Sequence, residues 1–431
     1  MDYEKIIIQW MEFEIPETLP RHQSIVLNHD FITTIIGPRR AGKTYLCFKK
    51  IKELLKEAIP KNNILYINFE DEKLIGSDAK DLDELLNKFY ELSEINKKYD
   101  IYLFLDEVHI VKNWDVWVRR INEMHKNIKI ILTGSSSKLL SREISTRLRG
   151  RVLSIELYPL SFKEYLNWGE INYDIKTLSN SKDRFKIKKE FKKYLTEGGY
   201  PAILTNKEID SSTILQRQFE TVIFRDIVER HNIKEIKKLR ILAKLLFESV
   251  TKEISYNRLS NKLKSLGFNI SKNTIIEYIS YFEDAYLFFQ NLKYEYSLTK
   301  QLGSIKKVYC IDNGVLNSVS FKFSEDIGRL MENLVYVELK RRGKEIFYHK
   351  KNYECDFLVK EKNKITEVIQ VTKELNDENS KREFGGLIEA LEKYKLKMGT
   401  IITKDTEKEE RIKGKMIKVT PIWKWLLTNN F

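Results

Sequence analysis

Short apolar runs alternate with longer amphipathic stretches along residues 1–160. The apolar runs are 31–37, 63–70, 100–107 and 128–135. Their nearly continuous apolar character is typical of parallel strands buried on both faces. The stretches 44–58 and 80–97 between them favour helices. This alternation predicts an α/β domain built on a parallel sheet.

The pattern changes twice further along the chain. Residues 160–230 become largely helical, and Gly198, Gly199 and Pro201 end one of these helices. A strong helical pattern follows at 233–250. Beyond about Asp312, a helix at 326–342 precedes a set of strand-like runs and one helix, at 345–349, 355–360, 365–372, 381–395 and 399–403. The second half of the chain therefore predicts a smaller α/β domain.

A phosphate-binding motif joins the first predicted strand to the first long helix. "GPRRAGKT" fits the pattern GxxxxGK[ST] and comprises Gly37, Pro38, Arg39, Arg40, Ala41, Gly42, Lys43 and Thr44. The glycines let backbone N–H groups turn toward phosphate oxygens, next to the positive end of the helix. Lys43 would bridge the β- and γ-phosphates, and Thr44 would ligate Mg²⁺. The motif predicts ATP and Mg²⁺ as cofactors.

Acidic and small polar residues follow two later strands. "IYLFLDE" ends in Asp106, which would hold Mg²⁺, and Glu107, which would orient and deprotonate water. This pair favours hydrolysis over kinase chemistry. In "LTGSSS", Thr133 or Ser135 could sense the γ-phosphate, although small polar residues here also suit a helix N-cap.

Three arginines, Arg147, Arg149 and Arg151, precede the next predicted strand. They could act as a finger on the nucleotide of a neighbouring subunit, or contact anions; Arg151 is the candidate carried forward. The alternative is ordinary surface charge. If one of these arginines acts on a neighbouring subunit, the protein is a homo-oligomer, and this stays one interpretation of the sequence.

Charge and cysteine content indicate which kinds of partner and which kinds of site the chain is expected to have. The chain has 76 Lys and Arg residues against 62 Asp and Glu residues, which gives a net charge of +14. This positive charge favours polyanions such as DNA as partners. The alternative is that it only reflects a lysine-rich surface. Cys47, Cys310 and Cys355 lie far apart, which argues against disulfides and zinc. No signal peptide and no apolar run of membrane-spanning length is present. We expect a cytoplasmic protein without a membrane partner.

Residues 251–297 resemble a helix-turn-helix. Ser255 can cap a first helix that ends at Gly267, and Ser271 can cap a second. On the second helix, the residues expected to face the core are Ile275, Ile276 and Ile279. Lys272, Asn273 and Glu277 would be exposed, as base or phosphate contacts are in such domains. "AYLFFQNLKY" and "KVYCID" could form a wing. DNA and protein remain alternative partners.

The order of these parts resembles the AAA-type P-loop ATPases, and more specifically a prokaryotic, archaeal-type ATPase family with a C-terminal domain of unknown function. The matching segments are "GPRRAGKT", "LFLDE", "ILTGSSSKLL", "LRGRV", "LYPLSFKEYL", "YLTEGGYPA", "FRDIVER", "KVYCIDNGV" and "GRLMENLVYVELKRRG". The resemblance implies a winged helix in the middle and a restriction-endonuclease-like fold near the C-terminus. We therefore expect a P-loop ATPase domain at 1–160, a helical lid at 161–230, a winged-helix-like domain at 231–314 and an endonuclease-like α/β domain at 315–431.

The endonuclease resemblance assigns metal-binding positions that this sequence fills only in part. Glu332 matches the first acid and Asp356 the second. A third acid and a lysine should share one face of the following strand. Gln370 and Thr372 stand there instead, and Lys373 projects from the opposite face. Glu332, Asp356 and Gln370 are thus the remnant of a degenerate metal centre.

Together these features predict a Mg²⁺-dependent ATPase that couples its nucleotide state to DNA or protein binding. Two alternatives stay open. One is a nucleotide-gated, metal-dependent DNA endonuclease. The other is a non-catalytic regulator that binds ATP.

Overall fold

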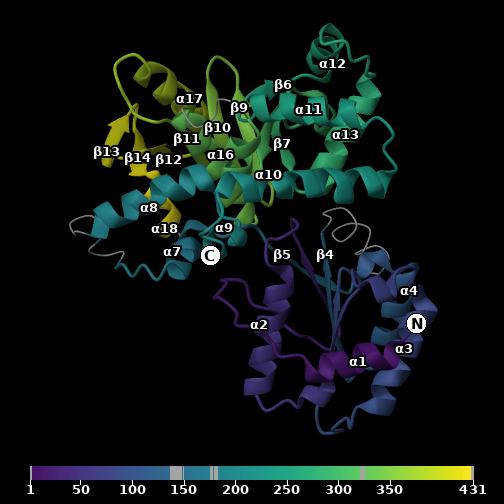
Figure 1. Cartoon of the computed structure of the whole chain (residues 1–431). Helices are drawn as coiled ribbons and strands as arrows, with labels where there is room; N and C mark the ends of the chain where they lie inside the picture. Colours follow the sequence, from purple (N-terminus) through teal and green to yellow (C-terminus); the bar gives the residue numbers. More distant parts are fainter. Residues whose placement is uncertain are drawn as a thin grey trace. The chain divides into compact units, whose positions relative to one another are not determined.

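A computed structural model describes residues 2–135, 148, 150–174, 178, 183–320 and 326–428. The chain divides into two compact units, Met1–Tyr158 and Pro159–Phe431. Figure 1 shows both units as mixtures of helices and strands, so the predicted α/β class is confirmed. Within the described part of the chain, no helix is both long and apolar enough to cross a membrane.

The first unit is built on a five-stranded sheet in the order β2-β3-β4-β1-β5. Its strands are β1 (Ile32–Ile36), β2 (Ile64–Asn68), β3 (Ile101–Asp106), β4 (Ile128–Gly134) and β5 (Val152–Glu156). All neighbouring strands pair in parallel. Because the central strands are buried along their whole length, their sequences are apolar without alternation. The parallel sheet predicted from these runs is confirmed.

In the described part of the first unit, the α-helices around this sheet are α1 (Tyr3–Glu12), α2 (Lys43–Lys56), α3 (Ala79–Leu92) and α4 (Trp114–Met124). In Figure 1, α2 lies on one side of the strands, and α3 and α4 lie on the other. The α1 helix packs against α3 and the edge strand β2, where Trp10 Nε1 donates to the Ile64 carbonyl at 2.6 Å. Both faces of the sheet are therefore covered, and its carboxyl edge is left to the loops.

The second unit begins with helices and continues into a mixed sheet. Its helical elements are α7 (Phe162–Trp168), α8 (Asp183–Glu197), α9 (Pro201–Thr205), α10 (Ser211–Thr221), the π-helix η5 (Val222–Glu229), α11 (Ile236–Glu248), α12 (Tyr256–Ser265), α13 (Lys272–Asp284), α14 (Leu298–Gly303), α15 (Asn313–Val319), α16 (Ile327–Arg341), α17 (Ser380–Lys393) and α18 (Ile422–Thr428). Its strands are β6 (Glu253–Ile254), β7 (Phe288–Lys293), β8 (Lys306–Cys310), β9 (Glu345–Lys350), β10 (Glu354–Glu361), β11 (Lys364–Val371), β12 (Met398–Thr403), β13 (Lys408–Ile412) and β14 (Lys415–Pro421).

These strands form one nine-stranded sheet in the order β13-β14-β12-β11-β10-β9-β7-β8-β6. The β7–β8 hairpin joins the C-terminal strands through a parallel pair, in which Leu292 faces Phe347 and Lys293 faces Tyr348. The sheet thus runs across the boundary that we predicted between residues 314 and 315. The division of the second unit into three domains stays a prediction, and the sheet is shared by two of them.

The predicted helix-turn-helix corresponds to α12 and α13. Ser271 caps α13 by accepting from the Thr274 N–H at 3.1 Å. Ile275 and Ile279 are buried, as expected, but Ile276 is 39% exposed, so its placement in the core was wrong. Because successive residues on a helix point about 100° apart, the stripe that includes Ile275 continues at Tyr278 rather than at Ile276.

Candidate nucleotide site

The motif 37–44 connects the carboxyl end of β1 to the start of α2. A Cβ atom on Gly37 would lie 2.1 Å from the Leu157 carbonyl oxygen, so only glycine fits there. Gly42 has φ 98° and forms the N-cap of α2, and Arg40 also has positive φ, at 63°. The loop therefore has the tight, left-handed turns that turn backbone N–H groups inward ahead of a helix N-terminus.

Lys43 is held inside this loop and is 5% exposed. Its Nζ donates to the carbonyl oxygens of Gly37, at 3.1 Å, and Pro38, at 3.2 Å. It also lies 3.3 Å from Glu107 Oε1. An ammonium group in this position can exchange carbonyl partners for phosphate oxygens without leaving the loop.

Asp106 is the last residue of β3, and its carboxylate accepts hydrogen bonds from three hydroxyl groups. Thr44 Oγ1 donates to its Oδ2 at 2.6 Å and Tyr66 OH donates to the same oxygen at 2.8 Å, while Thr133 Oγ1 donates to Oδ1. Burial and the charge of Glu107 raise the pKa of Asp106. The Thr44 hydroxyl and the Asp106 carboxylate are adjacent hard oxygen ligands, which fits Mg²⁺. When bound, Mg²⁺ would neutralise charge on phosphate oxygens at this position.

Glu107 is 7% exposed and adopts left-handed backbone geometry, with φ 53°. Its Oε2 accepts from the Ser135 N–H at 3.1 Å and lies 3.3 Å from His109 Nδ1. Its own N–H donates to Thr133 Oγ1 at 2.9 Å. Strained backbone at a buried acid is typical of residues whose position is imposed by function. Both carboxylate oxygens are fixed by neighbours.

The charge of Glu107 is stabilised in spite of its burial. Desolvation alone would raise its pKa, but Lys43, His109 and Arg39 together lower it. Arg39 is itself paired with Glu70 at 2.6 Å. An ionised carboxylate next to the phosphate loop is the form that can accept a proton from water.

Among the described residues, Arg151 is the arginine candidate, and it does not reach this site within the chain. Arg151 precedes β5, and its carbonyl oxygen accepts from the Ile32 N–H at the amino end of β1. The phosphate loop follows the opposite, carboxyl end of β1, and the Arg151 side chain pairs with Glu123 at 3.6 Å. A role for Arg151 across a subunit boundary stays a prediction. Arg147 and Arg149 lie outside the described residues.

Two residues of the site, Tyr66 and His109, were not identified by the sequence analysis. Tyr66 precedes the end of β2 by two residues, and the parallel pairing of β2 with β3 brings it beside Asp106. His109 follows Glu107 by two residues in "DEVH". An ionisable side chain this close to a proposed base was the signal available for His109, whereas Tyr66 required knowledge of strand order.

The three endonuclease-type residues lie together in the second unit. Glu332 comes from α16, Asp356 from β10 and Gln370 from β11. The Gln370 side-chain oxygen accepts from the Asp356 N–H at 3.2 Å. A lysine that the sequence did not single out, Lys307 of β8, lies 3.1 Å from Glu332 and 3.0 Å from Asp356. Lys373 is exposed, in line with its predicted orientation.

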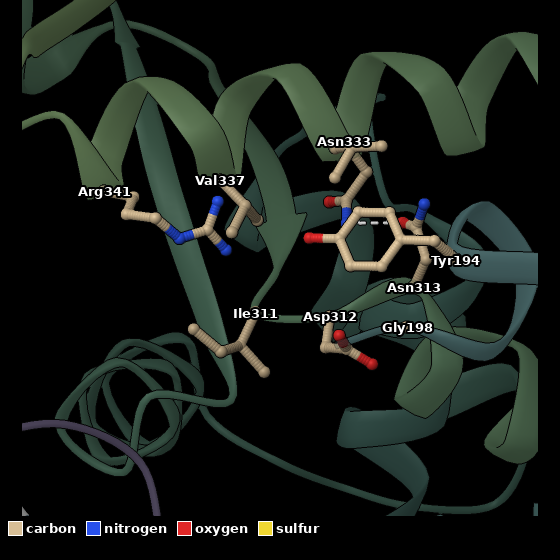
Figure 2. Close-up of a pocket in the computed structure, with 9 residues that line it drawn as sticks. Tyr194, Gly198, Ile311, Asp312, Asn313, Asn333, Val337 and Arg341 are labelled. Atoms are coloured by element: carbon tan, nitrogen blue, oxygen red, sulfur yellow. Dashed lines mark hydrogen bonds between the residues drawn. The ribbon is translucent and has the colours of Figure 1, made fainter. Parts of the chain in front are cut away.

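Three of the resemblance segments meet at a small cavity in the second unit. Figure 2 shows Tyr194, Asp312 and Asn333 around it, with a hydrogen bond of 2.9 Å from Asn333 to Asn313. Its volume of about 10 Å³ holds about one water molecule. Asp312 accepts from the Gly199 N–H at 2.8 Å. The segments "YLTEGGYPA" and "KVYCIDNGV" therefore pack against each other here, in a space too small for a nucleotide.

Comparison with known proteins agrees with this geometry. Residues 29–166 match the AAA domain family, and residues 188–326 match a domain of unknown function. Among solved structures, the chain is similar to the Walker-type ATPase PABY2304 of Pyrococcus abyssi, with 14% identity over 74% of this chain and 94% of that one, at a TM-score of 0.43. It is also similar to the ORC1 protein of Aeropyrum pernix in complex with DNA, with 11% identity over 73% and 89% of the two chains, at a TM-score of 0.31.

Two full-length relatives are uncharacterized proteins. The protein MJ1544 of Methanocaldococcus jannaschii is 40% identical over 99% of this chain and 95% of its own. A protein of Haemophilus influenzae is 32% identical over 92% and 94% of the two chains. The chain therefore belongs to the same protein family as MJ1544.

Proposed function

We propose that the first unit is a Mg²⁺-dependent ATP hydrolase. The observation that carries this proposal is the convergence of Lys43, Asp106 and Glu107 at the carboxyl edge of one parallel sheet. Lys43 would hold the β- and γ-phosphates after exchanging its carbonyl partners. Thr44 and Asp106 would hold the metal, and Glu107 would take a proton from the attacking water.

The geometry around Glu107 favours hydrolysis over binding alone. Ser135 and Thr133 fix its carboxylate and its N–H, and its ionised form is stabilised. A regulator that only binds ATP has no need of a buried, left-handed acid in this place. We infer that the strain at Glu107 serves catalysis.

The test is Glu107→Gln, with ATP turnover and ATP affinity measured separately. We expect turnover to fall by about 10²- to 10⁴-fold, as for other general bases, and affinity to change little. Glu53→Gln on α2 is the matched control, because Glu53 pairs only with lysines of its own helix in the ion pairs described, and both variants should fold alike. Unchanged turnover in Glu107→Gln would remove Glu107 from the mechanism. No turnover in the unaltered protein would favour the ATP-binding regulator.

We further propose that the second unit binds DNA through a winged helix. The order α11, β6, α12, α13, β7, α14, β8 supports this proposal, because β6, β8 and β7 pair in antiparallel as the strands of a winged helix would, with α14 inserted between β7 and β8. Lys272 and Asn273 are exposed at the start of α13, where DNA contacts would lie. Glu277 is exposed as well, and its carboxylate accepts from Tyr281 OH at 2.6 Å.

DNA binding is tested by titrating double-stranded DNA at two salt concentrations while following ATP turnover. Stimulation that weakens with salt supports a DNA partner, because phosphate contacts release counterions. Lys272→Glu should weaken binding, whereas Lys52→Glu in the first unit should not. Absence of both stimulation and binding would leave protein as the partner of this segment.

A further inference from the structure

Lys307 lies at the centre of a group of carboxylates in the second unit. Its Nζ is 2.7 Å from Glu354 Oε1, 3.0 Å from Asp356 Oδ1 and 3.1 Å from Glu332 Oε1. Only 2% of Lys307 is exposed. The ammonium group donates hydrogen bonds to Glu332 and Asp356 and forms an ion pair with Glu354.

The backbone prevents Lys307 from leaving this position. It is an internal residue of β8, facing Asn291 on β7 and Glu253 on β6. A strand paired on both sides cannot shift by one residue without turning every side chain to the other face. The ammonium group is therefore a fixed part of the sheet.

Other donors also reach the carboxylates around Lys307. Tyr309 OH donates to Glu332 at 2.8 Å, and the Val371 N–H donates to Asp356 Oδ2 at 3.0 Å. The Gln370 amide nitrogen donates to Glu383 at 2.6 Å, which turns its oxygen toward the Asp356 N–H. The amide oxygen that could have bound a metal is thus used by the backbone.

The charges are consistent with a lysine in place of a metal. Although burial opposes it, the surrounding carboxylates raise the pKa of Lys307 well above its ordinary value. With the ammonium group of Lys307 between them, Glu332, Glu354 and Asp356 are not spaced to hold a metal ion, and no other such group occurs among the described residues.

We propose that Lys307 is a built-in cation that occupies the position of a divalent metal, so that this centre binds Mg²⁺ or Mn²⁺ only when the ammonium group is removed. The ligand class of the site without the lysine is a hard divalent cation, held by Glu332, Glu354 and Asp356. In the natural sequence the centre holds β8, β10 and α16 together and has no metal-dependent phosphodiester chemistry.

The experiment measures Mn²⁺ binding to the full chain by calorimetry and electron paramagnetic resonance, without nucleotide. Lys307→Ala should bind one more Mn²⁺ per chain than the unaltered protein, and Lys307→Ala with Asp356→Asn should lose it. Lys307→Arg keeps the positive charge and should gain none. A folded Lys307→Ala that binds no additional Mn²⁺ would overturn the proposal.

A second experiment tests the proposal if Lys307→Ala does not fold. The unaltered protein and Glu354→Gln, whose side chain is 34% exposed, should bind the same amount of Mn²⁺ and should both fail to nick plasmid DNA with Mn²⁺. Mn²⁺ binding or nicking that is present in the unaltered protein and lost in Glu354→Gln would show a metal site and contradict the proposal. Recovery of folding in Lys307→Ala on addition of Mn²⁺ would support it.

Discussion

The molecule contains two centres in which a lysine meets buried carboxylates, and they differ in what the lysine can do. Lys43 lies in a glycine-containing loop and pairs with one carboxylate and two carbonyl oxygens. Lys307 lies inside a paired strand and contacts three carboxylates. The first lysine can exchange partners with an incoming phosphate, whereas the second is fully used by the fold. The same residue types thus lie in a loop in one unit and inside a paired strand in the other, which is the difference that the two proposals rest on.

Of the variants that compare the two lysine centres, Lys43→Ala should have the largest effect, which is on ATP turnover. Removing a positioned charge that stabilises the transition state typically costs about 10²- to 10³-fold. Folding should be preserved, since a loop can close over the missing ammonium group. Steady-state turnover is the measurement, and Lys50→Ala is the control, because Lys50 lies on the same helix and pairs with Glu53 at 3.4 Å. Equal losses in the two variants would contradict the role of Lys43.

Lys307→Ala should instead reduce stability and leave ATP turnover per folded molecule unchanged. Breaking a buried ion pair by removing one partner costs about 3–5 kcal/mol, since the other charges remain buried. Hydrogen exchange of the β8 and β10 amides measures this loss, and the amides of β1 and β3 serve as the internal reference. If exchange increases equally in both units, the effect is not specific to the carboxylate centre.

Asp312 shows what a buried carboxylate does when backbone N–H groups rather than a lysine surround it. It accepts from the N–H groups of Gly199, Gly314 and Val315, and burial raises its pKa from 3.8 to about 6. Between these pH values the folded chain binds more protons than the unfolded chain. The free energy of unfolding should therefore fall as pH rises through this window, by about 3 kcal/mol for this group.

Urea unfolding of the unaltered protein and of Asp312→Asn at pH 4, 5 and 6 measures this contribution. The difference in unfolding free energy between the two proteins should decrease over this range. A difference that is independent of pH would show that Asp312 keeps an ordinary pKa in the folded chain.

The smallest effect is expected for Thr133→Ala. Thr133 donates to Asp106 and accepts from the Glu107 N–H, so it orients both acids. Loss of these two hydrogen bonds corresponds to about 2 kcal/mol, or a turnover slower by about 30-fold. Thr133→Ser keeps the hydroxyl group and should restore most of the rate. A rate loss as large as that of Lys43→Ala would instead place Thr133 among the phosphate contacts.

The fold of the first unit could be predicted from the sequence, because the patterns that indicate it lie within short segments. Buried parallel strands are continuous apolar runs, and the phosphate loop is fixed by glycines whose neighbours leave no room for a Cβ atom. The proposed roles of Lys43, Thr44 and Asp106 required only the rule that parallel strands end at the same edge.

The second unit was harder because its key contacts are distant in sequence. Lys307 and Asp356 are separated by 49 positions, and no periodicity links them. Strand alternation placed Gln370 beside Asp356, but it could not reveal that another strand supplies the missing cation. Ile276 was wrongly predicted to be buried, because adjacent isoleucines do not show which of them faces the core.

The pairing of β7 with β9 has a practical consequence for dissecting this protein. A fragment that begins at residue 315 would lose β6, β7 and β8, and with them Lys307. It would keep Glu332, Glu354 and Asp356 without the ammonium group of Lys307 and would expose the edge of β9, which is an open template for aggregation. Insoluble expression of such a fragment would then reflect the position of the cut and not an inability of the C-terminal sequence to fold.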